Sequence, residues 1–202
     1  RDHLKGIVDQ VVELTRSTKP SVLDIGCNDG TLLSFYPSSY NCYGIDPSDI
    51  GQEVKGDFRI VKDLFPSEEL TKELAGAKFE IITSIAMFYD LEDPVGFVNA
   101  IKNSLSPTGV WVFEMSYMPM MLKMNSYDTI CHEHLEYYSL AVIEYILRKS
   151  DMQIVNAELN DINGGSIRCF ATHSRNFKYK SDEFSKRISA LRQEEFDLEL
   201  DT

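Results

Sequence analysis

The densest set of ionisable side chains in the sequence is His132-Glu133-His134, within the segment YDTICHEHLEYYS (residues 127–139). A histidine titrates near neutral pH and an adjacent carboxylate can tune or orient it, so this set suits general acid–base catalysis. Metal binding is disfavoured. The spacing is not His-Glu-x-x-His, no third ligand is near in sequence, and side chains two apart on a helix point away from each other. A structural role, in which the imidazoles cap the next helix, is the alternative interpretation.

A second set lies in the segment SVLDIGCNDGTLLSFY, residues 21–36. An apolar run leads into Asp24, and glycines follow at Gly26 and Gly30. This pattern predicts a buried strand, a tight turn and the first turn of a helix that begins near Thr31. Glycine lets the backbone turn sharply and lets a ligand lie against it, and a helix N-terminus suits a ligand carboxylate.

The glycine spacing discriminates between ligand classes. Asn28 stands where a dinucleotide fingerprint, Gly-x-Gly-x-x-Gly, has its second glycine. The pattern Asp24-x-Gly26-x-x-x-Gly30 instead resembles the first motif of S-adenosylmethionine (SAM)-dependent methyltransferases. That resemblance implies SAM as cofactor and S-adenosylhomocysteine (SAH) as product. A tight strand-to-helix turn in some other α/β protein is the alternative.

Residues further along the chain extend this candidate cofactor site. Asp46 ends a short predicted strand and lies roughly 20 residues after Gly26, where an acid in nucleotide-binding α/β folds accepts hydrogen bonds from ribose hydroxyls. Its alternative is a plain turn with the proline and serine that follow. Asp63 is a weaker candidate for contacting adenine, with solvation as its alternative. Ala86 lies where an apolar run ends, at the expected ligand edge of a parallel sheet. The predicted cofactor site comprises Asp24, Gly26, Asn28, Asp29, Gly30, Asp46, Asp63 and Ala86.

The segment 127–139 resembles the hallmark of SAM-dependent sugar C-methyltransferases, which methylate carbon 3 of nucleotide-linked 4-keto deoxysugars. Residues 26–32 and the run NGGSIR (163–168) resemble two further motifs of that family. The three matches lie within residues 21–173, which make up most of the chain. The glycine motif is shared with many methyltransferases, whereas Asp-Thr-Ile-x-His-Glu-His is much more specific.

This resemblance implies roles for individual residues. His134 matches the base that removes the proton beside the ketone, and Glu133 matches the glutamate that supports it. Cys131 stands where the family usually has a tyrosine that holds or polarises the substrate, and Tyr89 stands where relatives often carry histidine. The predicted catalytic residues are His134, Glu133 and His132, and the predicted substrate-binding residues are Cys131, Tyr89, Tyr127 and Asn163. No metal is predicted.

The elements that must position these residues follow from the apolar periodicity. Strands are expected before the glycine turn and at 41–46, 58–64, 79–87 and 110–115, with a turn at 107–109. Helices are expected at 3–15, 67–75, from Pro94, and at 140–149 with Ser139 as N-cap. Runs 152–158 and 166–173 predict an antiparallel hairpin. The order predicts an α/β fold: a doubly wound, seven-stranded class I (Rossmann-like) methyltransferase sheet with an antiparallel C-terminal hairpin.

Residues 1–176 are predicted to form the methyltransferase domain, with an active-site insert at 117–138. The highly charged residues 177–202 are expected to form a solvated helix. The sugar C-methyltransferase family also has an N-terminal zinc-binding module and a C-terminal substrate-binding domain, and neither is complete here. The chain is therefore expected to be a shorter relative or the core of a longer enzyme.

Composition narrows the partners. The chain has 202 residues and a net charge of −12, so its surface should repel nucleic acid and anionic membranes. No apolar run approaches the roughly 20 residues that a membrane helix needs. The four cysteines are scattered and form no C-x-x-C pair, which favours reduced thiols in a cytoplasmic protein. A local basic pocket could still bind an anionic nucleotide sugar.

Three functions are consistent with these observations. The first is methylation of a carbon next to a ketone of a nucleotide-linked deoxysugar, with His134 as base. The second keeps the fold and places the methyl group on an oxygen of a sugar or other small molecule. The third is a SAM-fold scaffold without enzymatic activity, which the intact Gly26, Gly30 and Asp46 set disfavours.

Overall fold

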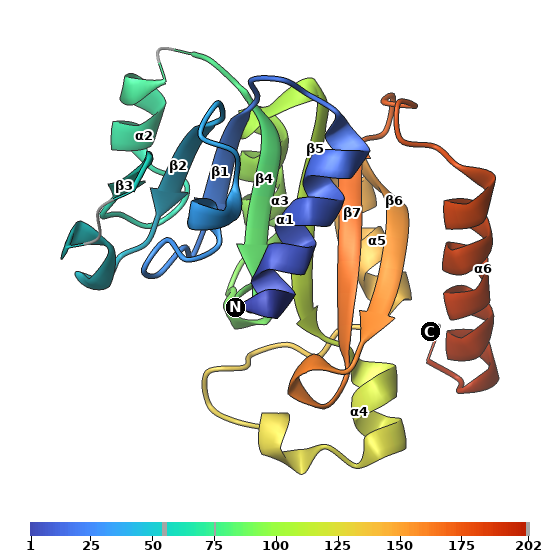
Figure 1. Cartoon of the computed structure of the whole chain (residues 1–202). Coiled ribbons are helices and arrows are strands. Elements are labelled where there is room, and N and C mark those ends of the chain that lie inside the picture. Colours follow the sequence, from blue (N-terminus) through green and yellow to red (C-terminus); the bar gives the residue numbers. More distant parts are fainter. Residues whose placement is uncertain (54–55, 75, 201–202) are drawn as a thin grey trace. The chain divides into compact units, whose positions relative to one another are not determined.

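The computed structural model describes residues 1–53, 56–74 and 76–200. Its described strands form one seven-stranded sheet with the order β3-β2-β1-β4-β5-β7-β6 (Figure 1). Strand β1 pairs in parallel with β2 and β4, and β2 pairs in parallel with β3, whereas β6 and β7 are antiparallel. This arrangement confirms the predicted α/β sheet and its C-terminal hairpin.

The contacts within the chain divide it into two units. Unit 1 comprises residues 1–84 and 103–111, and unit 2 comprises residues 85–102 and 112–202. Strand β5 (Leu105–Ser116) contributes residues to both units.

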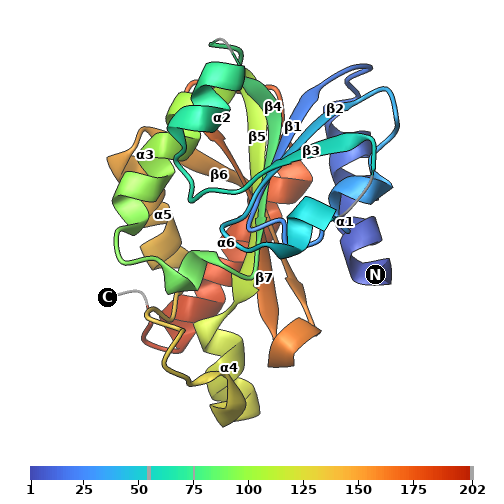
Figure 2. The ribbon, with the colours of Figure 1, turned by 90° about the vertical axis from the view of Figure 1, so that its left-hand side faces the viewer.

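Unit 1 contains the strands that lead to the predicted cofactor site. Its elements are α1 (Asp2–Thr15), β1 (Ser21–Ile25), the 3₁₀ turn η1 (Leu33–Phe35), β2 (Asn41–Ile45), η2 (Ile50–Glu53), β3 (Phe58–Val61), α2 (Glu68–Glu73) and β4 (Phe79–Ile85), which ends at the unit boundary. Helix α1 buries Ile7, Val8 and Val11 on one face, as the helical spacing of its apolar residues predicts. Helices α1 and α2 lie on opposite faces of these strands (Figure 2).

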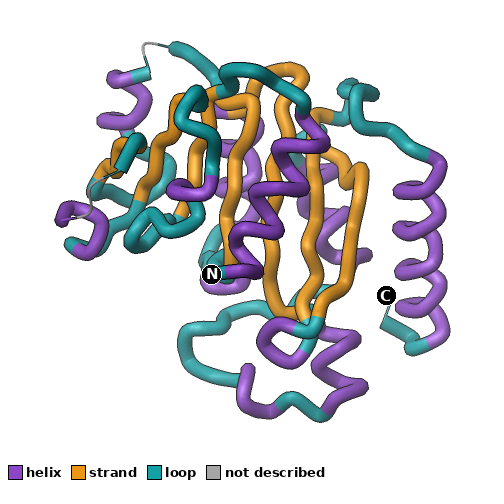
Figure 3. The backbone as a smooth tube through the Cα atoms, viewed as in Figure 1, coloured by secondary structure: helices purple, strands orange, loops and turns teal. Residues whose placement is uncertain are grey.

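Unit 2 contains the insert and the hairpin. Its elements are η3 (Phe88–Asp90), α3 (Pro94–Ser104), whose last residues lie in unit 1, α4 (Met118–Met124), η4 (Tyr127–Thr129), α5 (Leu140–Lys149), β6 (Met152–Asn160), η5 (Ile162–Gly164), β7 (Ser166–His173) and α6 (Asp182–Asp197). As predicted, Ser139 caps α5, and its hydroxyl accepts the Val142 N–H at 3.3 Å. The insert lies beyond one end of the hairpin strands as a loop that carries two short helical segments (Figure 3).

Three local predictions need correction. The helix expected from Thr31 is absent: one 3₁₀ turn ends at Phe35, because Tyr36 turns extended before Pro37, which disfavours the helical conformation in the residue before it. The turn expected at 107–109 lies inside β5, whose residues 106–108 are not buried, so the missing N–H of proline is tolerated there. The third strand ends at Val61 rather than at residue 64.

The predicted C-terminal helix is present as α6, but it is not solvated all round. Ile188, Leu191 and Glu195 are buried, and the helix packs against β6 and α5. Residues 201–202 of the predicted segment lie outside the described residues. In the part of the chain that the structure describes, no helix combines the length and apolar character needed to cross a membrane.

Candidate functional site

Asp24 is the buried acid at the centre of unit 1. It lies in β1 opposite Thr83 of β4, whose hydroxyl donates a 2.6 Å hydrogen bond to Oδ1 of Asp24. Burial is the main cause that raises the pKa of Asp24 from 3.8 to about 7; the Thr83 hydrogen bond opposes the rise and the nearby Asp46 charge adds to it. Thr83 was missed in the sequence, although a hydroxyl within an apolar strand is a signal that a buried polar partner lies close.

The turn after β1 joins the glycine motif to the acid at the end of β2. Gly26, Asn28 and Gly30 have left-handed backbones with φ of 71°, 49° and 70°. The carboxylate of Asp46 accepts the Asn28 N–H at 2.9 Å through Oδ2, and it accepts the N–H and hydroxyl of Ser48 through Oδ1. Burial opposes ionisation of Asp46, yet these hydrogen bonds lower its pKa below the usual value. The structure therefore brings the predicted turn and the predicted ribose-binding acid together.

The second half of the turn is organised differently from the prediction. The N–H of Thr31 donates to Oδ1 of Asp29 at 2.9 Å, so it does not point from a helix end toward a ligand. A Cβ at Gly30 would lie 2.6 Å from the Phe58 ring. Gly30 is thus required for its backbone conformation and for the packing of β3. A cavity of about 530 Å³ is lined by Asp29 and Gly30 but not by Asp24, Gly26, Asn28 or Asp46.

The other two predicted cofactor residues, Asp63 and Ala86, make hydrogen bonds of their own. Asp63 is exposed, and its carboxylate accepts the Leu64 N–H at 2.8 Å; hydrogen bonds from Ser67 and Leu64 lower its pKa. Ala86 lies in unit 2 with a left-handed φ of 56°, and its N–H donates to the Glu114 carbonyl at 2.8 Å. A non-glycine residue in this conformation is uncommon and marks a tightly determined bend.

His134 is the half-buried member of the His132-Glu133-His134 set, and the other two side chains are exposed. Its Nδ1 lies 2.7 Å from the carbonyl oxygen of Thr129. A carbonyl can only accept a hydrogen bond, so Nδ1 carries the proton, and the neutral ring then presents a lone pair at Nε2. That tautomer can remove a proton from a substrate. Thr129 was not among the predicted residues, because nothing in the sequence shows that its carbonyl meets the ring.

The short segment η3 contacts the insert at His134 and the two residues that follow it. The Tyr89 ring lies 4.2 Å from the His134 ring, centroid to centroid, with 48° between the planes. The Tyr89 carbonyl accepts the N–H groups of Leu135 and Glu136 at 3.0 and 3.1 Å. Tyr89 is buried, so it packs the imidazole in one orientation and fixes the chain just after it.

The carboxyl group of Asp90 interacts electrostatically with this histidine. Burial is the main cause that raises the pKa of Asp90; the charge of His134 lowers that pKa and the charge of Glu133 raises it. Burial, followed by the charges of Asp90 and Cys131, raises the pKa of Tyr89. The structure thus brings Tyr89, Cys131, Glu133 and His134 together with Asp90, which sequence reasoning missed. The available signal in the sequence was that Asp90 directly follows Tyr89, shortly after the apolar run that forms β4.

Tyr127 and Asn163 are placed differently. Tyr127 is 74% exposed in η4, and Asn163 is an exposed residue with a left-handed φ of 51° in the hairpin turn. Gly164 packs on Ser126 and Gly165 packs on Met120, so this turn supports the insert. The role of Tyr127 and Asn163 in acceptor binding stays a prediction.

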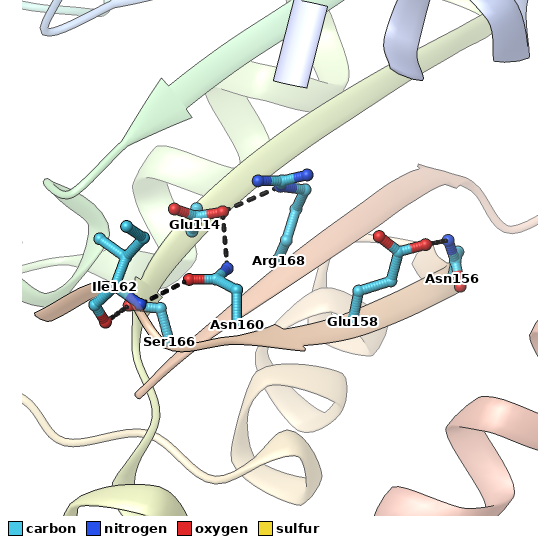
Figure 4. Close-up of polar contacts among 7 residues, drawn as sticks. All are labelled: Glu114, Asn156, Glu158, Asn160, Ile162, Ser166 and Arg168. Carbon is cyan, nitrogen blue, oxygen red and sulfur yellow. Dashed lines mark hydrogen bonds and ion pairs between the residues drawn. The ribbon is translucent and has the colours of Figure 1, made fainter. Parts of the chain in front are cut away.

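A buried polar cluster ties the hairpin to β5 (Figure 4). Oε2 of Glu114 accepts hydrogen bonds from Arg168 at 2.8 Å and from Asn160 at 3.0 Å. Oδ1 of Asn160 accepts the Ile162 N–H, and the Ser166 hydroxyl donates to the Ile162 carbonyl. The NGGSIR run therefore holds the turn on which the insert rests.

Among the described residues, no group of three or more histidine, cysteine, aspartate or glutamate side chains could hold a metal ion.

Comparisons with known proteins support the predicted fold. The C-methyltransferase NovU of Streptomyces niveus is 28% identical over 176 residues, which are 84% of this chain and 41% of NovU. The chain thus spans less than half the length of this relative.

Solved structures share the fold at low identity. The magnesium protoporphyrin IX methyltransferase ChlM from Synechocystis PCC 6803, with bound SAH, has a TM-score of 0.65 at 15% identity, covering 86% of this chain and 83% of ChlM. The plantazolicin methyltransferase BpumL, in complex with a desmethyl analogue and SAH, has a TM-score of 0.63 at 13% identity, covering 86% and 84%. Residues 3–157 match the family model described as a methyltransferase domain. The chain therefore belongs to the methyltransferase domain family, which confirms the prediction of a methyltransferase.

Proposed function

We propose that this protein transfers the methyl group of SAM to a carbon next to a ketone, in a nucleotide-linked deoxysugar, with His134 as the base. The family match supports methyl transfer, and the similarity to the C-methyltransferase NovU supports a carbon acceptor. The observation that carries the proposal is the Nδ1 contact with the Thr129 carbonyl, which leaves Nε2 of His134 as the basic nitrogen.

The residues of unit 1 fit the cofactor. Asp46 keeps a low pKa and accepts hydrogen bonds only, so its carboxylate suits the two ribose hydroxyls of SAM. The left-handed Gly26 and Asn28 turn the backbone sharply beside Asp46 and let a ligand approach the main chain. Asp24, Asp29 and Gly30 support this turn, and Asp63 and Ala86 are proposed adenine-side and substrate-edge contacts. When bound, SAM supplies an electrophilic methyl group on a sulfonium centre and leaves as SAH.

The residues of unit 2 account for the acceptor chemistry. Nε2 of His134 takes the proton from the carbon beside the ketone, and the electrons of that C–H bond form an enolate whose carbon bonds to the methyl group. Against the effect of burial, the charge of His134 lowers the pKa of the Asp90 carboxyl group, so the two groups attract each other, and Glu133 is proposed to support the base. Tyr89 orients the ring, and Cys131, Tyr127 and Asn163 are proposed to contact the acceptor. His132 is proposed as a further catalytic residue.

The test is a panel of nucleotide-linked sugars, with and without a 4-keto group, incubated with SAM and the complete gene product. We expect a mass increase of one methyl group on keto sugars only, and NMR of the product should show a new carbon–carbon bond. A methyl group on oxygen, with or without a ketone, would replace the proposal by O-methylation, because a histidine base can also deprotonate a hydroxyl. Absence of SAM binding would favour the scaffold interpretation.

A further inference from the structure

Helix α6 inserts a buried carboxylate into the rest of unit 2. Glu195 is only 1% exposed. Its Oε1 accepts the Tyr117 hydroxyl at 2.5 Å and also the N–H of Leu140, and its Oε2 accepts the N–H of Ala141 at 3.0 Å. Leu140 and Ala141 are the first two residues of α5, so Glu195 satisfies N–H groups that a helix start leaves unpaired.

These partners flank the insert on both sides. Tyr117 is its first residue, and Leu140 follows its last residue by two positions. The two ends also meet directly, because the Met118 N–H donates to the Tyr138 carbonyl at 3.1 Å. We call residues 117–118 and 138–141 the neck of the insert. Glu195 accepts hydrogen bonds from both of these segments.

A second contact joins the same helix to the body of the insert. Glu194 forms an ion pair with Lys123 of α4. Neighbouring residues of α6 therefore hold the neck and the first helix of the segment that carries His134.

We propose that Glu195 is a positioning residue, which closes the neck of the insert and thereby fixes the His132-Glu133-His134 segment. A buried carboxylate is costly unless its hydrogen bonds are made, so docking of α6 and closure of the neck favour each other. The catalytic consequence rests on the proposed function, whereas the structural consequence does not. The charged C-terminal helix α6 then helps to position the proposed catalytic residues of unit 2.

The test compares Glu195→Gln and Tyr117→Phe with the control Arg192→Gln. Arg192 forms an ion pair with Glu144, which joins the same two helices, α6 and α5, through a pair of side chains outside residues 138–141. Glu195→Gln keeps the shape but turns an NH₂ group toward a backbone N–H, and Tyr117→Phe removes one hydrogen bond only. Hydrogen–deuterium exchange of peptides from residues 117–138 is measured in all three variants, together with SAM affinity and turnover.

We expect exchange in the insert to rise about tenfold or more in Glu195→Gln, by less in Tyr117→Phe, and not in Arg192→Gln. SAM affinity should stay within about twofold while turnover falls, because the cofactor residues of the glycine turn are untouched.

If insert exchange rises equally in the control, or only α5 and α6 exchange faster, Glu195 merely holds helices together and the proposal is wrong. If Glu195→Gln does not fold, unchanged insert exchange in folded Tyr117→Phe overturns it. If the wild type transfers no methyl group, the proposed function fails while the exchange result still decides the role of Glu195.

Discussion

The pKa values of two aspartates in the proposed cofactor site shift in opposite directions because the surroundings of the two carboxyl groups differ. Asp24 is buried with one hydroxyl partner, so its pKa rises, whereas Asp46 accepts three hydrogen bonds and its pKa falls. At neutral pH the site therefore combines a carboxylate that is firmly ionised with one that is poised to take up a proton. Each behaviour gives a prediction.

Asp24 should make the protein less stable as the pH rises from about 4 to about 7. Its folded pKa lies above its unfolded pKa, so the folded state binds more protons in this range, and the free energy of unfolding falls by up to about 4 kcal/mol as the pH increases. Asp24→Asn removes this contribution. Urea unfolding at a series of pH values should show a flatter profile for the variant, and identical slopes would contradict the raised pKa.

Asp46→Ala should weaken SAM binding by about 1–3 kcal/mol, because the ribose hydroxyls would be left without their acceptor. Titration calorimetry measures the change. Asp49→Ala is a matched control, because its exposed carboxylate pairs with Lys62 on the surface. Equal affinities for wild type and Asp46→Ala would remove Asp46 from the site.

Residue types and spacing selected candidate residues but could not predict the contacts that these residues make. The sequence singled out His134 and Asp46 as candidates, because a histidine beside a glutamate and an acid after a strand are recognisable patterns. It could not identify Thr129, which orients His134 through a backbone carbonyl, since every residue has one. Asp90 and Thr83 act through neighbours that are remote in sequence, and only the fold brings those neighbours together.

At the scale of elements, apolar runs located the strands of the sheet, and the capping serine located α5. The helix after the glycine turn failed as a prediction because Pro37 leaves too few residues for it. The turn relies instead on left-handed residues and on Asp29, with the Phe58 ring packed over Gly30. The burial of one face of α6 was missed because a largely charged helix gives a weak apolar period.

Gly30→Ala should destabilise unit 1 by about 1–3 kcal/mol, from the clash with Phe58 and from the left-handed backbone. Phe58→Leu provides space, so the double variant Gly30→Ala/Phe58→Leu should lose less stability than the sum of the two single variants. Chemical denaturation of the four proteins measures this coupling. Strict additivity would show that the ring does not constrain Gly30.

For the whole molecule, the residues proposed for cofactor binding and those proposed for catalysis belong largely to different units. Unit 1 carries the predicted cofactor residues except Ala86, and unit 2 carries the predicted catalytic and acceptor residues. Variants in the two units should therefore have different phenotypes. Changes at Asp46 should weaken SAM binding, and changes at His134 should leave it intact while they abolish proton removal.

Proton removal can be measured apart from methyl transfer, and this measurement tests the central claim most directly. The complete gene product is incubated with a nucleotide-linked 4-keto sugar in heavy water without SAM, and NMR follows the proton beside the ketone. The wild type should exchange it for deuterium. His134→Asn should slow the exchange by about 10²–10⁴-fold, because the amide can keep the hydrogen bond to Thr129 but cannot accept the proton. Asp46→Ala should exchange as the wild type does, and exchange at the wild-type rate in His134→Asn would contradict the account.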